Sequence, residues 1–170
     1  MMDDPALKEH FVQMIREHQG IINSLCSLYY QHKEDQHDTR QDIILQLWKS
    51  FPSFRNQAKE STWIYKVGLH TIFSKLRKEK KWPKSESLEE IKAQNLSIEA
   101  PTDDDVQQLK QLIQCLQGLD KAIIVLHLEG YQHKEIASML ELTITNVSTR
   151  MNRIKTALRA KYKRGKYELE

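Results

Sequence analysis

Residues 130–158 constrain the fold more than any other part of this 170-residue chain, because they hold two helical patterns around one short break. In the first pattern, Ile136, Ala137 and Leu140 share one side of a helix. Thr143 follows the break and can cap a second helix by accepting a bond from an orphan N–H. The apolar residues of that second helix recur at spacings of four, three and four: Val147, Met151, Ile154 and Leu158. The segment therefore predicts two helices joined by a tight turn.

The other side of the second helix is polar and carries charge of one sign, since no Asp or Glu occurs from Leu142 to Tyr167. A merely solvated face, as in an ordinary helical hairpin, would normally mix signs to gain pairs one turn apart. We therefore expect a DNA-binding helix-turn-helix, although Glu141 stands where such turns usually prefer Gly. Side chains of these types contact base edges and phosphates in the major groove. The expected contacts are Thr143, Thr145, Asn146, Ser148, Thr149, Arg150, Asn152, Arg153 and Lys155.

The rest of the chain also predicts helices, because it has few helix breakers and no convincing period-two alternation. Only five Gly and four Pro occur in the whole sequence, so we expect an all-α protein. Pro52 and Pro83 each stop a helix, and Ser61 or Thr62 is positioned to cap one. The three amphipathic helices expected before the linker span residues 6–32, 38–51 and 62–82.

A change of composition separates two parts of the chain. Residues 84–105 hold seven acids against two bases and few large apolar residues, which predicts a flexible acidic linker. Helical periodicity resumes at Val106. We therefore expect two small helical domains, residues 1–83 and 106–165, on either side of this linker.

Composition also narrows the class of protein. Cys26 and Cys115 lie far apart among apolar neighbours, which indicates buried thiols in a reducing compartment. No apolar run is long enough to span a membrane and the N-terminus is polar, so we expect a cytoplasmic protein without membrane insertion. No nucleophile–base pair, phosphate-binding Gly loop or metal-ligand spacing occurs. We accordingly expect no catalytic residue, no metal site and no cofactor.

Aromatic and basic side chains interleave between Phe54 and Trp82. Aromatic rings can stack on unpaired bases while neighbouring cations hold the phosphate backbone. Trp63 and Phe73 are equally compatible with ordinary core positions, and a basic helix end also favours the helix dipole. Trp48 has two interpretations as well: packing inside the first domain, or an aromatic anchor of a protein-docking face.

Two separate motifs, one before the linker and one after it, occur in an order that resembles one known family. DIILQLWKSFPSFR is followed by STWIYKVGLHT and, after the linker, by LDKAIIVLHLEGYQHKEIASMLELTITNVSTRMNRIKTAL. This order strongly resembles the extracytoplasmic-function group of bacterial sigma factors, in the sigma-70 family. The resemblance covers nearly the whole chain outside the linker. It implies a subunit that binds core RNA polymerase and directs transcription initiation at particular promoters.

The resemblance also implies roles for particular residues. The core polymerase would dock on Asp38, Asp42, Ile43, Gln46, Leu47 and Trp48. The −10 promoter element would contact Gln57, Lys59, Glu60, Thr62, Trp63, Tyr65, Lys66, His70, Lys75, Arg77 and Lys78. The helix matching residues 143–157 would read the −35 element, and an anti-sigma partner is common in the family. Glu60, His70 and the ITNV run depart from the family's usual residues, which bears on the DNA sequence preference.

A stand-alone helix-turn-helix regulator is the alternative function. Such regulators usually dimerise on paired half-sites. This chain has no evident dimerisation heptad, so we expect a monomer when it is free of partners.

Overall fold

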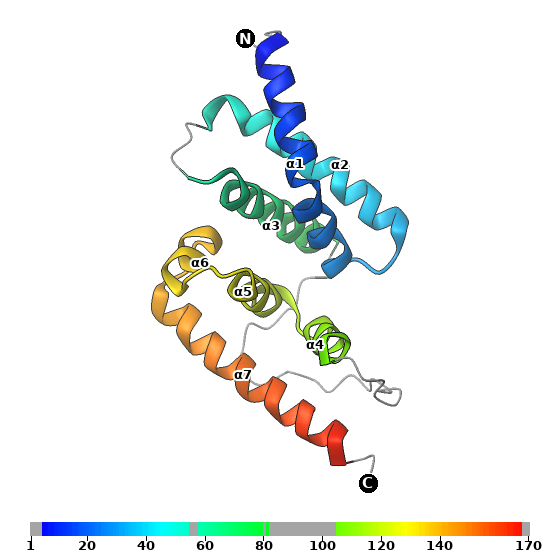
Figure 1. Ribbon diagram of the computed structural model, residues 1–170, viewed down its shortest axis with the longest axis vertical. Helices are drawn as coiled ribbons and strands as arrows, with labels where there is room; N and C mark the ends of the chain where they lie inside the picture. The colour runs from blue at the N-terminus through cyan, green and yellow to red at the C-terminus, as the bar shows by residue number, and fades with distance from the viewer. Residues whose placement is uncertain (1–4, 55–57, 80, 82–104, 168–170) are drawn as a thin grey trace. The chain divides into compact units, whose positions relative to one another are not determined.

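The computed structural model describes residues 5–54, 58–79, 81 and 105–167, and these residues form helices and connecting turns without a strand (Figure 1). The all-α prediction is therefore confirmed. The chain divides into two compact units, residues 1–82 and 83–170. The predicted linker, 84–105, lies outside the described residues except for Asp105, where a helix begins.

The first unit is built on three helices, each of which packs against the other two (Figure 1). They are α1 (Pro5–Tyr29), α2 (Lys33–Ser50) and α3 (Glu60–Lys78), with a short 3-10 turn, η1 (Phe51–Ser53), after α2. Gly68 allows close packing, because a Cβ there would stand 2.8 Å from Cδ1 of Leu25. The fully buried side chains of the first unit include Met14, Ile22, Leu25, Ile43, Leu47, Ile64, Leu69 and Ile72.

Several helix ends in this unit differ from the sequence prediction. The first helix ends at Tyr29 rather than at His32. The second helix begins at Lys33 rather than Asp38, because Glu34 and Asp35 in its first turn interact favourably with the helix dipole. The third helix ends at Lys78 rather than Trp82, where the Lys81 N–H donates to the Leu76 carbonyl and closes the last turn.

The start of α3 also differs. Lys59 occupies the N-cap position without a side-chain cap, so the predicted caps Ser61 and Thr62 lie inside the first turn. The stop at Pro52 is confirmed, since α2 ends at Ser50 and Pro52 lies in η1. The predicted stop at Pro83 lies outside the described residues.

The described residues of the second unit, 105–167, form the helices α4 (Asp105–Gln114), α5 (Gly118–Leu128), α6 (His133–Leu140) and α7 (Ile144–Tyr167). Helix α5 contacts α4, α6 and α7, and α6 also packs on α7. The predicted inward residues Val147, Met151 and Ile154 are buried, whereas Leu158 is half-buried. Other core residues of this unit are Ile113, Leu116, Ile123, Ile124, Leu126, Ile136, Met139 and Leu140.

The two cysteines differ in environment. Cys26 is buried in the first unit, and burial raises the pKa of its thiol to about 11. Cys115 is only partly covered, and its thiol donates to the Gln111 carbonyl at 3.2 Å. The prediction of a buried thiol is therefore correct for Cys26 and wrong for Cys115, which lies in the last turn before α5.

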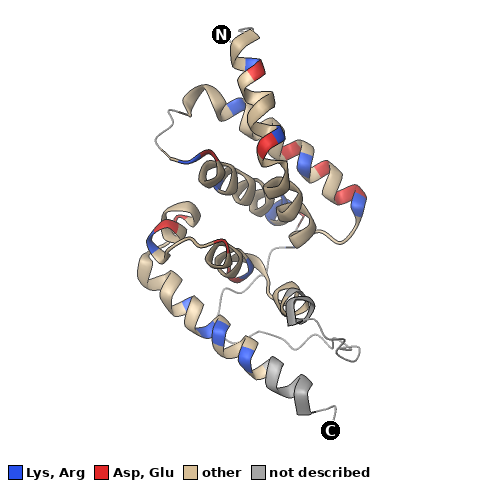
Figure 2. Ribbon diagram, in the orientation of Figure 1, with Lys and Arg blue, Asp and Glu red and all other residues tan. Residues whose placement is uncertain are grey.

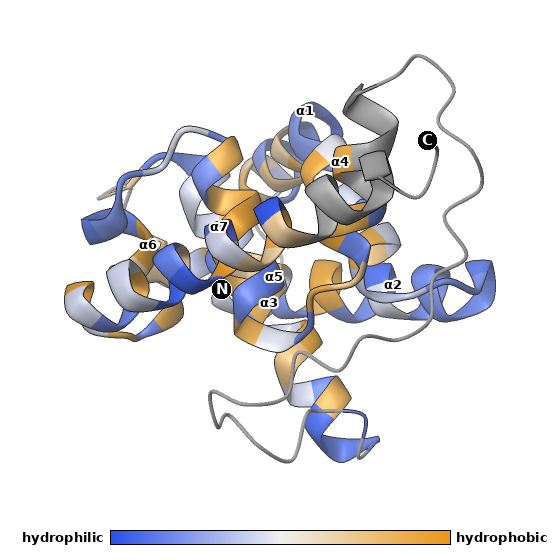
Figure 3. Ribbon diagram, turned by 90° about the horizontal axis from the view of Figure 1, so that it is seen from below, coloured by the Kyte–Doolittle hydropathy of each residue, from blue (hydrophilic) through white to orange (hydrophobic). Residues whose placement is uncertain are grey.

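The helices are amphipathic. Figure 3 shows hydrophobic and hydrophilic residues on the same helices in both units. Among the described residues, no helix combines the length and apolar character that crossing a membrane requires.

Candidate nucleic-acid interface

The turn between α6 and α7 has the geometry of a helix-turn-helix. Glu141 adopts a left-handed conformation with φ 58° and ψ 40°, and the following Leu142 N–H donates to the Ala137 carbonyl at 2.9 Å. Thr143 Oγ1 then accepts a hydrogen bond of 3.1 Å from the Asn146 N–H. The predicted cap is therefore confirmed, and Glu141 takes up the conformation that Gly would adopt with less strain.

One face of α7 is exposed, polar and free of acidic residues. Figure 2 shows only Lys and Arg among the charged residues coloured on this helix. Of the nine residues predicted to contact the −35 element, three are half-buried: Ser148, Arg150 and Arg153. The six that are exposed are Thr143, Thr145, Asn146, Thr149, Asn152 and Lys155.

The two arginines of α7 converge on one carboxylate of α5. Arg150 Nη1 donates to Asp120 Oδ1 at 2.9 Å, and Arg153 Nη2 donates to Asp120 Oδ2 at 3.1 Å. The side chain of Arg150 is only 13% exposed, that of Arg153 22% and that of Asp120 14%. Arg150 Nε also donates to Asn146 Oδ1 at 2.8 Å. Both cations are thus bound within the unit rather than projecting freely into solvent.

Histidines of α5 and α6 border the same helix. His133 Nδ1 lies 3.0 Å from Ser148 Oγ, and the His127 and His133 rings are 6.1 Å apart between centroids. Burial lowers the pKa of His127, and the charge of Lys155 and then His133 adds to that shift. The contact with His133 means that the Ser148 hydroxyl already has a hydrogen-bond partner within the unit.

In the first unit, the residues predicted to contact the −10 element divide between surface and core. Tyr65 is buried, and Gln57 lies outside the described residues. Trp63 stacks on Phe54 with centroids 4.6 Å apart and an interplanar angle of 24°. The exposed members are Lys59, Arg77 and Lys78, and the half-buried members are Glu60, Thr62, Trp63, Lys66, His70 and Lys75.

Lys75 and Glu60 of this set contact ionisable side chains on other helices of the first unit. Lys75 Nζ lies 3.1 Å from Asp42 Oδ2 of α2, with side chains 23% and 51% exposed. Glu60 Oε2 lies 3.3 Å from His18 Nε2, and its Oε1 lies 3.6 Å from His10 Nε2. Both partners of Glu60 belong to α1, so this carboxylate connects the start of α3 to α1.

The predicted docking residues of α2 likewise lie on two sides of the helix. Ile43 and Leu47 are fully buried, and half-buried Trp48 packs edge-to-face on Phe11 with centroids 4.9 Å apart. The members exposed to solvent are Asp38, Asp42 and Gln46.

Sequence reasoning missed two exposed apolar side chains on these surfaces. Leu45 of α2 is 48% exposed, and Ile144 at the start of α7 is 51% exposed. The apolar residues nearest to them in the sequence are buried or, like Ile44 and Leu142, half-buried, so only the helix orientation distinguishes the exposed one. It also missed Asp120, because nothing local links that residue to α7.

Two family models match this chain at the regions just described. Sigma-70 region 2 matches residues 14–82, and sigma-70 region 4 matches residues 106–158. The first match contains the larger, C-terminal part of α1 together with α2 and α3, and the second contains nearly all of α4, then α5, α6 and the first part of α7.

Curated relatives span most of the chain. The ECF RNA polymerase sigma factor SigM of Mycobacterium tuberculosis is 25% identical over 155 residues, covering 87% of this chain and 74% of that protein. The ECF RNA polymerase sigma-E factor of Escherichia coli is 23% identical over 161 residues, covering 87% of this chain and 84% of that protein.

Solved structures share the fold. The sigma factor RpoE of Bartonella quintana, in complex with the anti-sigma factor NepR, gives a TM-score of 0.68 at 16% identity over 91% of this chain and 98% of that one. CnrH, in complex with the cytosolic domain of CnrY, gives 0.62 at 17% identity over 92% of this chain and 89% of that one.

The chain therefore belongs to the extracytoplasmic-function group of the sigma-70 family. It is a promoter-specificity subunit, whose partners are core RNA polymerase and promoter DNA. The resemblance stated from its motifs is confirmed.

Proposed function

We propose that three surfaces divide the work of this sigma factor: the exposed face of α2 docks core polymerase, α3 contacts the −10 element, and α7 reads the −35 element. The observation that carries the proposal is the exposed face of α7, which is polar, follows a capped turn and has no acidic residue. Such a face suits a helix that lies in the major groove of DNA, where cations meet phosphates and polar side chains meet base edges.

The docking surface is the exposed side of α2 around Leu45. Asp38, Asp42, Leu45, Gln46 and Lys49 recur one turn apart and are all exposed. An apolar side chain with a polar rim is the usual composition of a binding hot spot. Ile43 and Leu47 act from the core by holding α2 in place, because neither reaches the surface.

The −10 surface follows the exposed and half-buried polar side chains along α3. Thr62, Lys66 and His70 recur at four-residue intervals, so they share one face of the helix. Lys59 and Arg77 lie at its two ends and are exposed. Trp63 is half-buried and already stacked on Phe54, so any base that reaches it would add to an existing aromatic stack.

The −35 surface is the start of α7. Asn146 is exposed and its Oδ1 accepts a bond from Arg150, which fixes the orientation of its amide. Asn pairs bidentately with adenine in the major groove. Exposed Ile144 is a candidate for apolar contact with a thymine methyl group. Lys155 lies further along the helix, where phosphate contact is expected.

The same proposal assigns no catalytic activity to the chain and places it in the cytoplasm with polymerase and promoter DNA. It also includes an anti-sigma partner as a further ligand. The RpoE structure supports this last point, since it is a complex of a sigma factor of the same fold with an anti-sigma factor.

Transcription from a pool of genomic fragments with purified core polymerase tests the proposal. We expect new transcript 5′ ends to appear with this chain and to share sequence motifs near −10 and −35. Leu45→Ala should reduce core binding and all new starts together, whereas Val12→Ala, an equally exposed apolar site on α1, should not. A stand-alone regulator would instead bind duplex DNA without creating any new start.

A further inference from the structure

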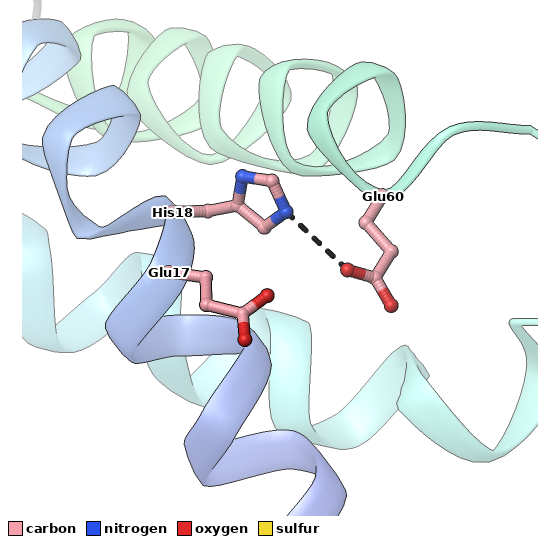
Figure 4. A group of neighbouring side chains, drawn as sticks. All are labelled: Glu17, His18 and Glu60. Carbon is pink, nitrogen blue, oxygen red and sulfur yellow. Dashed lines mark hydrogen bonds and ion pairs between the residues drawn. The ribbon is translucent and has the colours of Figure 1, made fainter.

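Three side chains with metal-binding donors meet where α1 passes the start of α3. Glu17 and His18 belong to α1, and Glu60 opens α3 (Figure 4). One donor atom from each residue lies within 4.8 Å of the other two. His18 Nε2 lies 3.3 Å from Glu60 Oε2. This group is formed by tertiary packing, because Glu60 is 42 residues from His18.

The chemistry of these donors suits a borderline divalent metal ion. One imidazole nitrogen and two carboxylates are ligands found at zinc and other first-row transition-metal sites. Mg²⁺ and Ca²⁺ prefer oxygen donors alone, so the histidine argues against them. His18 and Glu60 are half-buried and Glu17 is exposed. This partial exposure leaves room for water to complete the coordination shell.

Two neighbouring side chains hold the carboxylates in place. Gln13 Nε2 donates to Glu17 Oε1 at 2.6 Å, and His10 Nε2 lies 3.6 Å from Glu60 Oε1. The Gln13–Glu17 contact is a hydrogen bond of the kind that orients metal ligands in known sites, and His10 adds an electrostatic contact to Glu60. In each carboxylate, these neighbours contact one oxygen and leave the other able to bind a cation.

Electrostatics supports the same conclusion. Glu17 and Glu60 bring two negative charges close together, and the neighbouring cationic groups in contact with Glu60 are histidines, which are charged only when protonated. A divalent cation bound among the three side chains would compensate both negative charges and take the His18 nitrogen as its third ligand.

We propose that Glu17, His18 and Glu60 bind one divalent transition-metal ion, with zinc as the representative, and that the bound ion ties α1 to the first turn of α3. The sequence predicted no metal site. Glu17 and His18 are adjacent, and two neighbouring donors without a third are not a metal-binding motif.

Titration calorimetry of the full chain, stripped with chelator, tests the binding. We expect one Zn²⁺ per chain. His18→Ala and Glu60→Gln should each weaken binding by more than about tenfold, and His10→Gln should weaken it less, because His10 contacts Glu60 but supplies no ligand atom. The matched control is His37→Ala, an exposed histidine beside Asp38 on α2, which should bind Zn²⁺ as the wild type does.

Two results would overturn the proposal. One is the absence of Zn²⁺ binding to the wild-type chain. The other is binding that His18→Ala and Glu60→Gln weaken no more than His37→Ala does, which would indicate an adventitious ion only. Circular dichroism would verify that each variant is folded, and Mg²⁺ bound as tightly as Zn²⁺ would contradict the role of the His18 nitrogen.

Hydrogen exchange tests the tie between the helices. Bound Zn²⁺ should slow amide exchange in the first turn of α3 and in α1 around Glu17, because opening either segment would break ligand bonds. The Glu60→Gln variant should lose this protection. Unchanged exchange in a wild-type chain saturated with Zn²⁺ would show that the ion does not connect the two helices.

Discussion

The two candidate DNA surfaces hold their basic side chains in different ways. In the first unit, Lys75 pairs with an Asp42 side chain that is 51% exposed, so water competes with the pair. In the second unit, Arg150 and Arg153 share Asp120, and no member of that triad is more than 22% exposed. A charge on α3 is therefore easily released to a phosphate, whereas the two arginines of α7 help to pack α7 against α5. Basic residues counted along a helix are not equivalent to cations available for DNA.

The largest expected effect is on stability. Asp120→Ala leaves two half-buried guanidinium groups without their carboxylate, and bonds to charged groups contribute about 1.5–3 kcal/mol. We expect the second unit to lose about that much free energy of unfolding. All three Trp lie between residues 48 and 82, so their fluorescence reports the first unit. Urea unfolding should move the circular-dichroism transition of the second unit and leave the Trp transition unchanged.

The matched control for this prediction is Asp42→Ala in the first unit. Exposed ion pairs contribute roughly 0–1 kcal/mol, so the Trp transition should move little. Equal losses from Asp120→Ala and Asp42→Ala would remove the distinction between the two surfaces.

The next effect concerns DNA reading by α7. Asn146→Ala removes an exposed amide, and loss of one base contact should cost about 1–3 kcal/mol and relax preference at one base pair. Lys155→Ala should instead weaken binding to all sequences alike and lower the salt slope by about one. Binding titrations on a set of single-base variants, at several salt concentrations, separate the two outcomes. Uniform loss in both variants would mean that α7 binds DNA without reading it.

A smaller effect is expected from the arginines themselves. Because Arg150 and Arg153 are bound to Asp120, Asp120→Asn should make them more available and raise affinity for non-specific duplex DNA. The salt slope should grow by up to about one for each new phosphate contact. Asp42→Asn should change non-specific binding less, since the exposed Asp42 carboxylate already exchanges Lys75 for water. A decrease in affinity with Asp120→Asn would show that the carboxylate orients the arginines toward DNA instead.

The smallest effect is a shift in histidine titration. The pKa of His127 lies below its ordinary value of 6.5, first through burial and then through Lys155. A lowered pKa in the folded chain means that the neutral form is favoured there. The stability from this group is therefore present above pH 6.5 and is lost as pH falls through the lower folded-state pKa. Lys155→Ala should raise the His127 pKa, which an NMR titration of its ring protons measures.

Local sequence signals predicted much of the helical structure. Thr143 was identified as a cap because a hydroxyl before an apolar periodic run has a recognisable local partner, and its bond to the Asn146 N–H confirms this. Ser61 and Thr62 offered the same hydroxyl before α3, but the helix begins before both of them, at Glu60. Glu60 faces His18 and His10 of α1 in the folded unit, and contacts with a distant helix have no local signature.

The site residues likewise divide into features that local sequence predicted and features that helix packing decided. Periodicity placed the buried side of α7 correctly, and the resemblance to the family assigned its polar side to the −35 element. Which polar residues remain exposed was decided by packing, since Ser148 meets His133 and both arginines meet Asp120. The −10 and docking assignments likewise include residues such as Tyr65, Ile43 and Leu47 that the fold buries.

The sequence by itself determined the helical class, the capped turn before α7 and the family, because each depends on residues within a few turns of one another or on motifs in order along the chain. The tertiary structure alone decided which ionisable side chains are brought together. Asp120 and Arg150 are 30 residues apart, and His18 and Glu60 are 42 apart. Coulombic pairing and metal coordination act over a few ångströms in space, and helix packing sets those distances independently of separation along the chain.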